Sequence, residues 1–136
     1  MAAQVDFWGD IGPAVVRTPA SIMREQAALL GQKTQNLVEA RVDTRADPYA
    51  GAGQFVHTFK LVVPTLDDYT YDLFEVSHPV SLYPVTAHGP GRSLAYMAGK
   101  RDELNTEDEF KNWLKDRLGS DETKKIIGNL LAQVTS

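Results

Sequence analysis

The side chains best suited to proton transfer near neutral pH are the three histidines, His57, His78 and His88. His57 lies on the apolar side of an alternating stretch, between Phe55 and Phe59, where a hydrogen-bonded core residue is a more common role than a catalytic base. His78 precedes a proline and His88 precedes Gly-Pro-Gly, so we place both in loops. None of the three shows the H-x-H, H-x-x-x-H or H-E-x-x-H spacing of metal ligands. The sequence therefore predicts no metal site and no cofactor.

Carboxylates form the second candidate group. Asp67 and Asp68 adjoin each other, and Glu75 follows on the next stretch of alternating residues. Paired carboxylates can hold a metal or act as general acid and base, but aspartates at a chain reversal are more often turn residues with solvated charge. The chain also has no cysteine, no G-x-S-x-G and no G-x-x-x-x-G-K-[ST] pattern. We accordingly predict no catalytic residues.

The best candidate for a binding site is the segment 83–93, which contains the loop-like pentapeptide HGPGR. Its glycines allow a ligand to approach the backbone, and its consecutive amides can form an anion-binding nest. A plain surface turn remains the simpler interpretation, because no helix clearly begins there to complete a phosphate cradle. The candidate ligand- or partner-binding residues are Tyr83, His88, Arg92 and Ser93.

Composition narrows the class of protein. The 136 residues are 43% hydrophobic and 24% charged, which predicts one folded domain, 1–136. Residues 1–17 show no clear period, so we expect an irregular arm whose aromatic side chains pack against the body. The net charge of -4 disfavours nucleic acid as a partner. No apolar run approaches the roughly 20 residues that cross a bilayer, and no secretory signal is present, so we expect a soluble, cytoplasmic protein without a membrane contact.

The elements that must position these residues follow from periodicity. Thr18 begins a helix that ends near Gly31 or Thr34, and a strand with alternating valines starts at Asn36. Residues 46–53 form a loop, and 55–76 form two strands joined by a turn at 64–68. The apolar face of the second strand switches between Leu73 and Phe74, which predicts a bulge or cover on both faces. Residues 80–87 are predicted to be an edge strand because of two nearby prolines, and 93–97 a further strand.

The C-terminal third shows clear helix signals. Thr106 and Glu109 form a capping box before an apolar stripe that ends at Gly119. Ser120 caps a second helix, and the two-residue connection predicts a helical hairpin. The apolar residues of the second helix lie on one face: Ile126, Ile127, Leu130, Leu131 and Val134.

Together these elements predict an α+β domain with an N-terminal helix, an antiparallel sheet of about four to five strands, and a C-terminal helical hairpin. The leading functional hypothesis is a non-enzymatic protein-interaction or regulatory module of the immunity or adaptor type, which binds a protein partner through a sheet edge and the 83–93 loop. Two alternatives stay open. One is a small hydrolase or transferase for an anionic substrate, with His88 and Arg92 in its pocket. The other is a structural subunit of a homo-oligomer.

Overall fold

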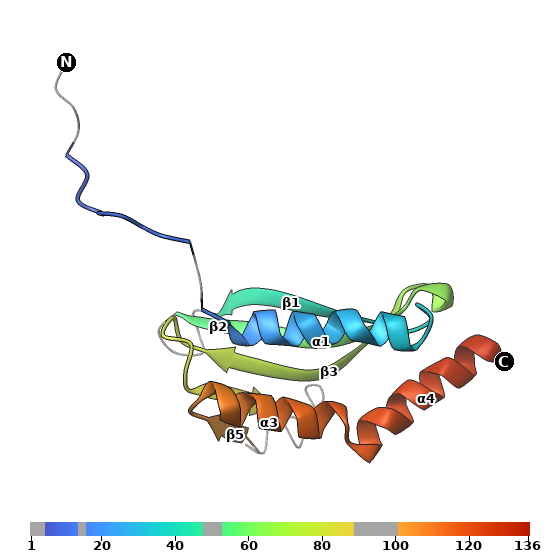
Figure 1. Cartoon of the computed structure of the whole chain (residues 1–136). Helices are drawn as coiled ribbons and strands as arrows, with labels where there is room; N and C mark the ends of the chain where they lie inside the picture. Colours follow the sequence, from blue (N-terminus) through green and yellow to red (C-terminus); the bar gives the residue numbers. More distant parts are fainter. Residues whose placement is uncertain (1–4, 14–15, 48–52, 89–100) are drawn as a thin grey trace.

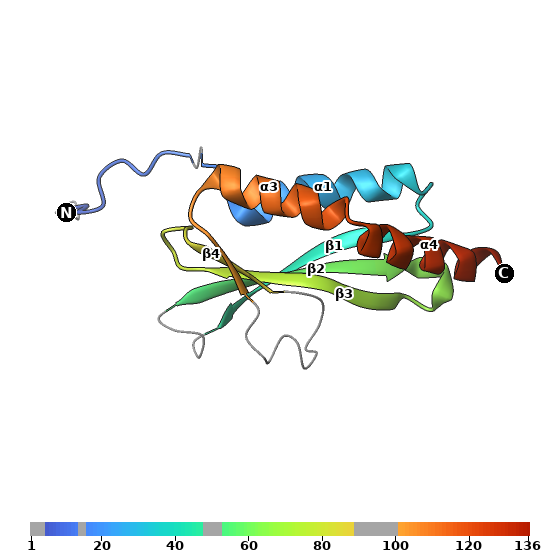
Figure 2. The ribbon, with the colours of Figure 1, turned by 90° about the horizontal axis from the view of Figure 1, so that it is seen from below.

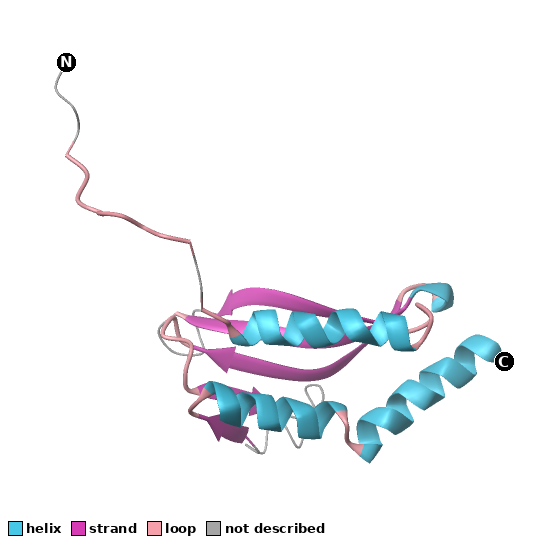
Figure 3. Cartoon of the chain, viewed as in Figure 1, coloured by secondary structure: helices cyan, strands magenta, loops and turns pink. Residues whose placement is uncertain are grey.

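The computed structural model describes residues 5–13, 16–47, 53–88 and 101–136, and it has the predicted α+β architecture. Helix α1 (Pro19–Lys33) precedes a five-stranded sheet, and helices α3 (Glu107–Leu118) and α4 (Asp121–Thr135) follow it (Figures 1 and 3). All three helices cover the same face of the sheet (Figure 2). No helix in the described part of the chain is long and apolar enough to span a bilayer.

The sheet is an antiparallel meander in which every strand pairs with its neighbours in sequence. Its strands are β1 (Glu39–Asp47), β2 (Gln54–Val63), β3 (Tyr69–His78), β4 (Val85–His88) and β5 (Arg101–Leu104). The prediction of an edge strand over 80–87 is wrong, because β4 starts at Val85 and pairs on both sides. The prolines that suggested an edge, Pro79 and Pro84, precede β4 and therefore remove no ladder donor. The strand predicted over 93–97 lies outside the described residues.

The predicted hairpin of β2 and β3 is present, with a bulge at the predicted place. Phe59 pairs with Phe74 and Lys60 pairs with Asp72, so Leu73 is the extra residue. The bulge lets Leu73 and Phe74 both be buried, with 0% and 1% of their surface exposed. Between the strands, the 3-10 turn η1 (Pro64–Leu66) is followed by Asp67 and Asp68, both in the left-handed region that aspartate tolerates.

The core lies between the sheet and the helices. Phe59 and Phe74 stack at the centre with ring centroids 5.1 Å apart, and the edge of Trp113 from α3 meets Phe74 at 5.0 Å. The opposite face of the sheet carries charges instead. Lys60 there pairs with Asp43 at 3.1 Å. On that face β2 also buries Val56 and Val62, each 3% exposed.

The helix boundaries agree with the predicted caps. The hydroxyl of Thr18 accepts from the amide of Ser21, and that of Thr106 accepts from the amide of Glu109. The amide of Asn105 donates to the Glu109 carboxylate, which extends the capping box by one residue. α1 continues past Gly31 to Lys33.

The two C-terminal helices are joined by Gly119 and Ser120, as predicted, and the connection is an open bend. Figures 1 and 2 both show α4 continuing away from α3 and towards the C-terminal end of α1. The hydroxyl of Thr123 donates to the carbonyl of Arg117 at 2.7 Å and fixes this bend. Because α4 does not fold back onto α3, its apolar face is turned to the space beside α1.

The N-terminal arm differs from the expectation that its aromatics pack against the body. Phe7 and Trp8 are 93% and 82% exposed, and Ile11 is 78% exposed. Figure 1 shows the described residues 5–13 leading away from the sheet and helices.

Candidate functional site

Two histidines from neighbouring strands form a buried contact on the helix face of the sheet. The Nε2 atoms of His57 in β2 and His78 in β3 are 2.8 Å apart, and the two residues are only 4% and 3% exposed. Nδ1 of His57 lies 2.8 Å from the hydroxyl of Thr44, and Nδ1 of His78 lies 2.8 Å from the carbonyl of Pro79. His57 is therefore a hydrogen-bonded core residue, as predicted. The prediction of a loop position for His78 is wrong, because this residue ends β3.

The partners at both ends fix the direction of the hydrogen bonds. The carbonyl of Pro79 can only accept, so Nδ1 of His78 donates and its Nε2 accepts from His57. Nδ1 of His57 then accepts from the hydroxyl of Thr44, which in turn accepts from the Arg24 guanidinium at 3.0 Å. Both rings are neutral in this arrangement, and every ring nitrogen has a partner.

Burial also disfavours a charge on His57. Desolvation, with further contributions from His78 and from Arg24, lowers the pKa of His57 to about 4. The pair has a structural role, because the Pro79 carbonyl that His78 contacts also accepts a hydrogen bond from the amide of Leu82 at 2.9 Å. His78 thus holds the turn that leads into β4. Across the described ranges, no group of three potential metal ligands comes together.

Of the predicted 83–93 site, only residues 83–88 lie within the described part of the chain, so the site itself stays a prediction. Tyr83 is half-buried near the start of α3, and burial, followed by Glu107 and Asp108, raises the pKa of its hydroxyl. Within the described part of the chain this buried hydroxyl has no hydrogen-bond partner. The loop position predicted for His88 is wrong, because it ends β4, where it pairs with Glu75. Arg92 and Ser93 lie outside the described residues, so an anion pocket there stays a prediction.

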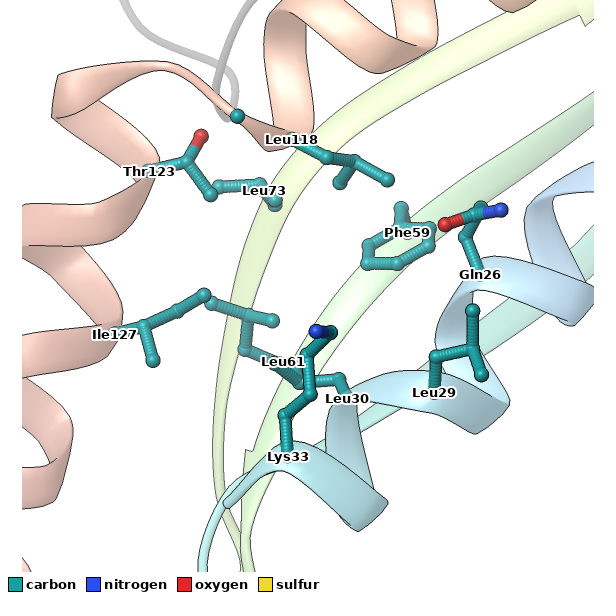
Figure 4. A pocket seen from close by; sticks show the side chains of 11 residues that line it. Gln26, Leu29, Leu30, Lys33, Phe59, Leu61, Leu73, Leu118, Thr123 and Ile127 are labelled. Atoms are coloured by element: carbon teal, nitrogen blue, oxygen red, sulfur yellow. The ribbon is translucent and has the colours of Figure 1, made fainter.

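A cavity of about 230 Å³ opens on the helix side of the sheet, between α1 and α4 (Figure 4). Its floor is formed by Phe59 and Leu61 from β2 and by the bulge residue Leu73 from β3. The walls come from α1, from the end of α3 and from α4: Leu29, Leu30, Leu118 and Ile127. The floor and walls named here are entirely apolar.

A second cavity, of about 450 Å³, adjoins the first between α1 and α3. Gln26 and Leu118 line both cavities, so the two cavities adjoin. The second cavity also has Ile22 and Leu114 in its wall. We call these two adjoining sections, bounded by α1 on one side and by α3 and α4 on the other, the helix groove.

The apolar stripe of α4 is incompletely covered beside the helix groove. Its five large aliphatic residues are all half-buried, and Thr123 is the only residue of α4 that is fully buried. By contrast, α3 buries Phe110 and Leu114 completely in the core. An amphipathic helix normally buries its apolar stripe against a neighbour. The stripe of α4 therefore leaves room for another apolar group in the groove.

The helix groove is locally positive although the whole chain has a net charge of -4. Lys33 lines the first section and extends from α1 towards the apolar floor (Figure 4). The second section contributes Arg17, Lys111 and Lys115 against a single acid, Glu25. Arg17 pairs with Glu25 and Lys111 pairs with Glu107, whereas no carboxylate of the described residues forms an ion pair with Lys33 or Lys115.

Sequence reasoning did not find this groove. The sequence predicts the apolar face of α4 and a helical hairpin, but it does not predict a groove beside that face. Whether a two-residue link folds back or stays open depends on the bend at Gly119, which periodicity does not report. The available signal was the strong amphipathic pattern of α4 combined with three cations on α1 and α3 and with Arg17 just before α1.

No protein-family model, curated protein or solved structure matches this chain. The fold and the site of the described residues place it in a class defined by structure: in that part of the chain, an antiparallel five-stranded meander carries three helices on one face, with an open groove between them. The helix groove is consequently the basis for a functional proposal.

Proposed function

We propose that the protein is a non-enzymatic interaction module that binds an apolar segment with acidic flanks, from a protein partner, in the helix groove. The observation that carries the proposal is the half-buried stripe of α4 beside the apolar 230 Å³ section. A groove between helices commonly accepts a partner's apolar side chains, and its charged rim selects the sign of the partner's flanks. Lys33 and Lys115 favour acidic flanks.

The chemistry of the histidine pair supports a binding role over catalysis. His57 and His78 are buried and saturated by their partners, and neither lines a section of the helix groove. A general base must reach a substrate proton directly or through one water. This proposal moves the interaction surface from the sheet edge and the 83–93 loop to the groove, because β4 is interior.

Binding of an anionic apolar dye tests the groove. Anilinonaphthalene sulfonate carries both an apolar ring system and a negative charge, so its fluorescence should rise on protein whose groove is unoccupied. In the double variant Leu29→Glu/Lys33→Glu, affinity should fall by at least about tenfold, because the change adds charge to the wall and reverses the cation. Both positions are solvent-exposed, so the fold should survive. The matched control is Val80→Glu, an exposed apolar residue outside the groove.

Partner capture then tests the function itself. The native chain and the Val80→Glu control, immobilised separately, should retain the same protein from a native lysate, and the groove variant should lose it. A synthetic peptide of the partner's acidic apolar segment should displace the dye. A partner retained equally well by Leu29→Glu/Lys33→Glu would show that binding occurs elsewhere.

A further inference from the structure

The arm of residues 5–13 carries the most exposed apolar side chains of the described chain. Phe7, Trp8 and Ile11 are each more than three-quarters exposed. Local geometry shapes this arm: the carboxylate of Asp6 accepts from the amide of Trp8 at 2.8 Å, and Gly9 follows with φ of 67°. This turn presents two adjacent aromatic residues on a short, pre-shaped segment.

The arm and the helix groove are complementary in chemistry. The acids of the arm, Asp6 and Asp10, flank its aromatics on both sides. The groove offers an apolar floor with Lys33 beside it and Lys115 further along. A cavity of about 150 Å³ holds a benzene molecule, so the section of about 230 Å³ has room for one aromatic side chain.

We propose that the arm of one copy binds in the helix groove of a second copy, with Trp8 as the anchor in the 230 Å³ section and the acids of the arm facing Lys33 and Lys115. The inference rests on the proposed function of the groove and names a second copy of this chain as its occupant. The arm leads away from its own body (Figure 1), which favours exchange between copies. Reciprocal exchange closes a two-fold dimer, because each copy then supplies one arm and one groove.

Light scattering of complementary variants tests the exchange. The arm variant Phe7→Ser/Trp8→Ser keeps its groove, and the groove variant Leu29→Glu/Lys33→Glu keeps its arm. The native chain should be a dimer and each variant alone a monomer. An equimolar mixture of the two variants should recover a 1:1 complex, since one intact arm can still enter one intact groove. The control Val80→Ser should remain dimeric, as it changes an exposed apolar residue outside both surfaces.

A charge exchange tests the orientation of the arm. Lys33→Glu with Lys115→Glu should weaken dimerisation, and adding Asp6→Lys and Asp10→Lys on the same chain should restore it. Rescue would require that these charges meet, because four surface changes have no other reason to compensate each other. Failure of the rescue, with each chain folded by circular dichroism, would contradict the proposed orientation.

Fluorescence separates exchange from the competing outcomes. In a Trp113→Phe background, Trp8 is the single tryptophan, and it should be shielded from acrylamide only at concentrations where the dimer forms. A monomer with Trp8 shielded would mean that the arm occupies its own groove, and a monomer with Trp8 fully quenched would mean that it occupies none. Either result overturns the exchange. The proposed function fails separately, if the groove variant still binds the dye and the captured partner.

Discussion

His57 and His78 illustrate how two titratable side chains become a structural pair. Their 2.8 Å Nε2 contact needs one donor and one acceptor, so it can exist with both rings neutral or with one ring charged, but not with both charged. Arg24 lies at the far end of the chain of hydrogen bonds, beyond Thr44, and adds a positive charge that opposes protonation of His57. The pair should therefore make the fold sensitive to acid.

The first prediction concerns the pH dependence of folding. The pKa of His57 is lowered from 6.5 to about 4, so between these values the unfolded state binds the proton and the folded state does not. Stability should be fully present above pH 6.5 and should fall as the pH drops towards 4, by at most about 1.4 kcal/mol per pH unit from this group.

Urea unfolding at pH 7.5, 6.5, 5.5 and 4.5 measures this slope, with His57→Gln as the comparison. Glutamine cannot titrate, but its amide can still donate towards His78 and accept from Thr44. The variant should lose part of the slope between pH 6.5 and 4.5. An unchanged slope would assign the acid sensitivity to other groups.

The second prediction concerns the link between α3 and β5. The Nε1 atom of Trp113 donates to the Asp102 carboxylate at 2.9 Å, while its ring edge packs on Phe74. Trp113→Phe removes the hydrogen bond and keeps an aromatic ring, so it should destabilise the fold by about 1 kcal/mol plus a smaller packing loss. Trp113→Ala should cost more, because the aromatic contact is also lost. Chemical denaturation of both variants measures the difference.

At the residue scale, local context predicted some roles and missed others. His57 was placed correctly because its apolar neighbours alternate along one strand. His78 was missed because its environment comes from the register of β2 against β3, which pairs Phe55 with His78 and is not encoded next to the histidine itself. Residues that meet across strands require the register, and a single sequence does not provide it.

At the scale of elements, signals within a few residues were the informative ones. The caps at Thr18, Thr106 and Ser120 and the bulge at Leu73 follow from local hydrogen bonding and from local patterning. The interior position of β4 in the sheet did not follow from local signals. Prolines indicate an edge strand only if they lie inside the strand, and here they precede it. The bend after α3 was equally out of reach, because it depends on the backbone at Gly119, which periodicity does not report.

The third prediction tests the capping box of α3. Thr106→Ala removes the hydroxyl that accepts a hydrogen bond from the amide of Glu109, so this amide in the first turn of the helix is left without its acceptor. Stability should fall by about 1 kcal/mol. Asn112→Ala, at an exposed position in the middle of the same helix, is the matched control and should change stability little or raise it slightly. Equal losses in the two variants would contradict a specific role for the cap.

At the scale of the whole molecule, the distribution of charge matters more than its sum. The net charge of -4 describes an acidic chain, but the concave surface that the fold creates is positive. Apart from Glu25, the acids lie outside the helix groove, on the opposite face of the sheet, at the helix starts and on the arm. A global balance cannot report this separation, because the residues that line the helix groove come from α1, α3, α4, β2 and β3.

The fourth prediction concerns how stability depends on protein concentration. If the arm is exchanged between copies, dimerisation stabilises the folded state by mass action, and the midpoint of thermal unfolding, Tm, rises with concentration. A tenfold increase in concentration should raise the Tm of the native chain by roughly 3 °C, whereas the Tm of Phe7→Ser/Trp8→Ser should stay constant. Scanning calorimetry over a hundredfold range of concentration measures both.

At low concentration the Tm values of the native chain and of Phe7→Ser/Trp8→Ser should converge, because the exposed arm of a monomer adds no contact to its own body. A Tm that is independent of concentration in the native chain would contradict arm exchange, while dye binding in the groove would still report on the proposed function.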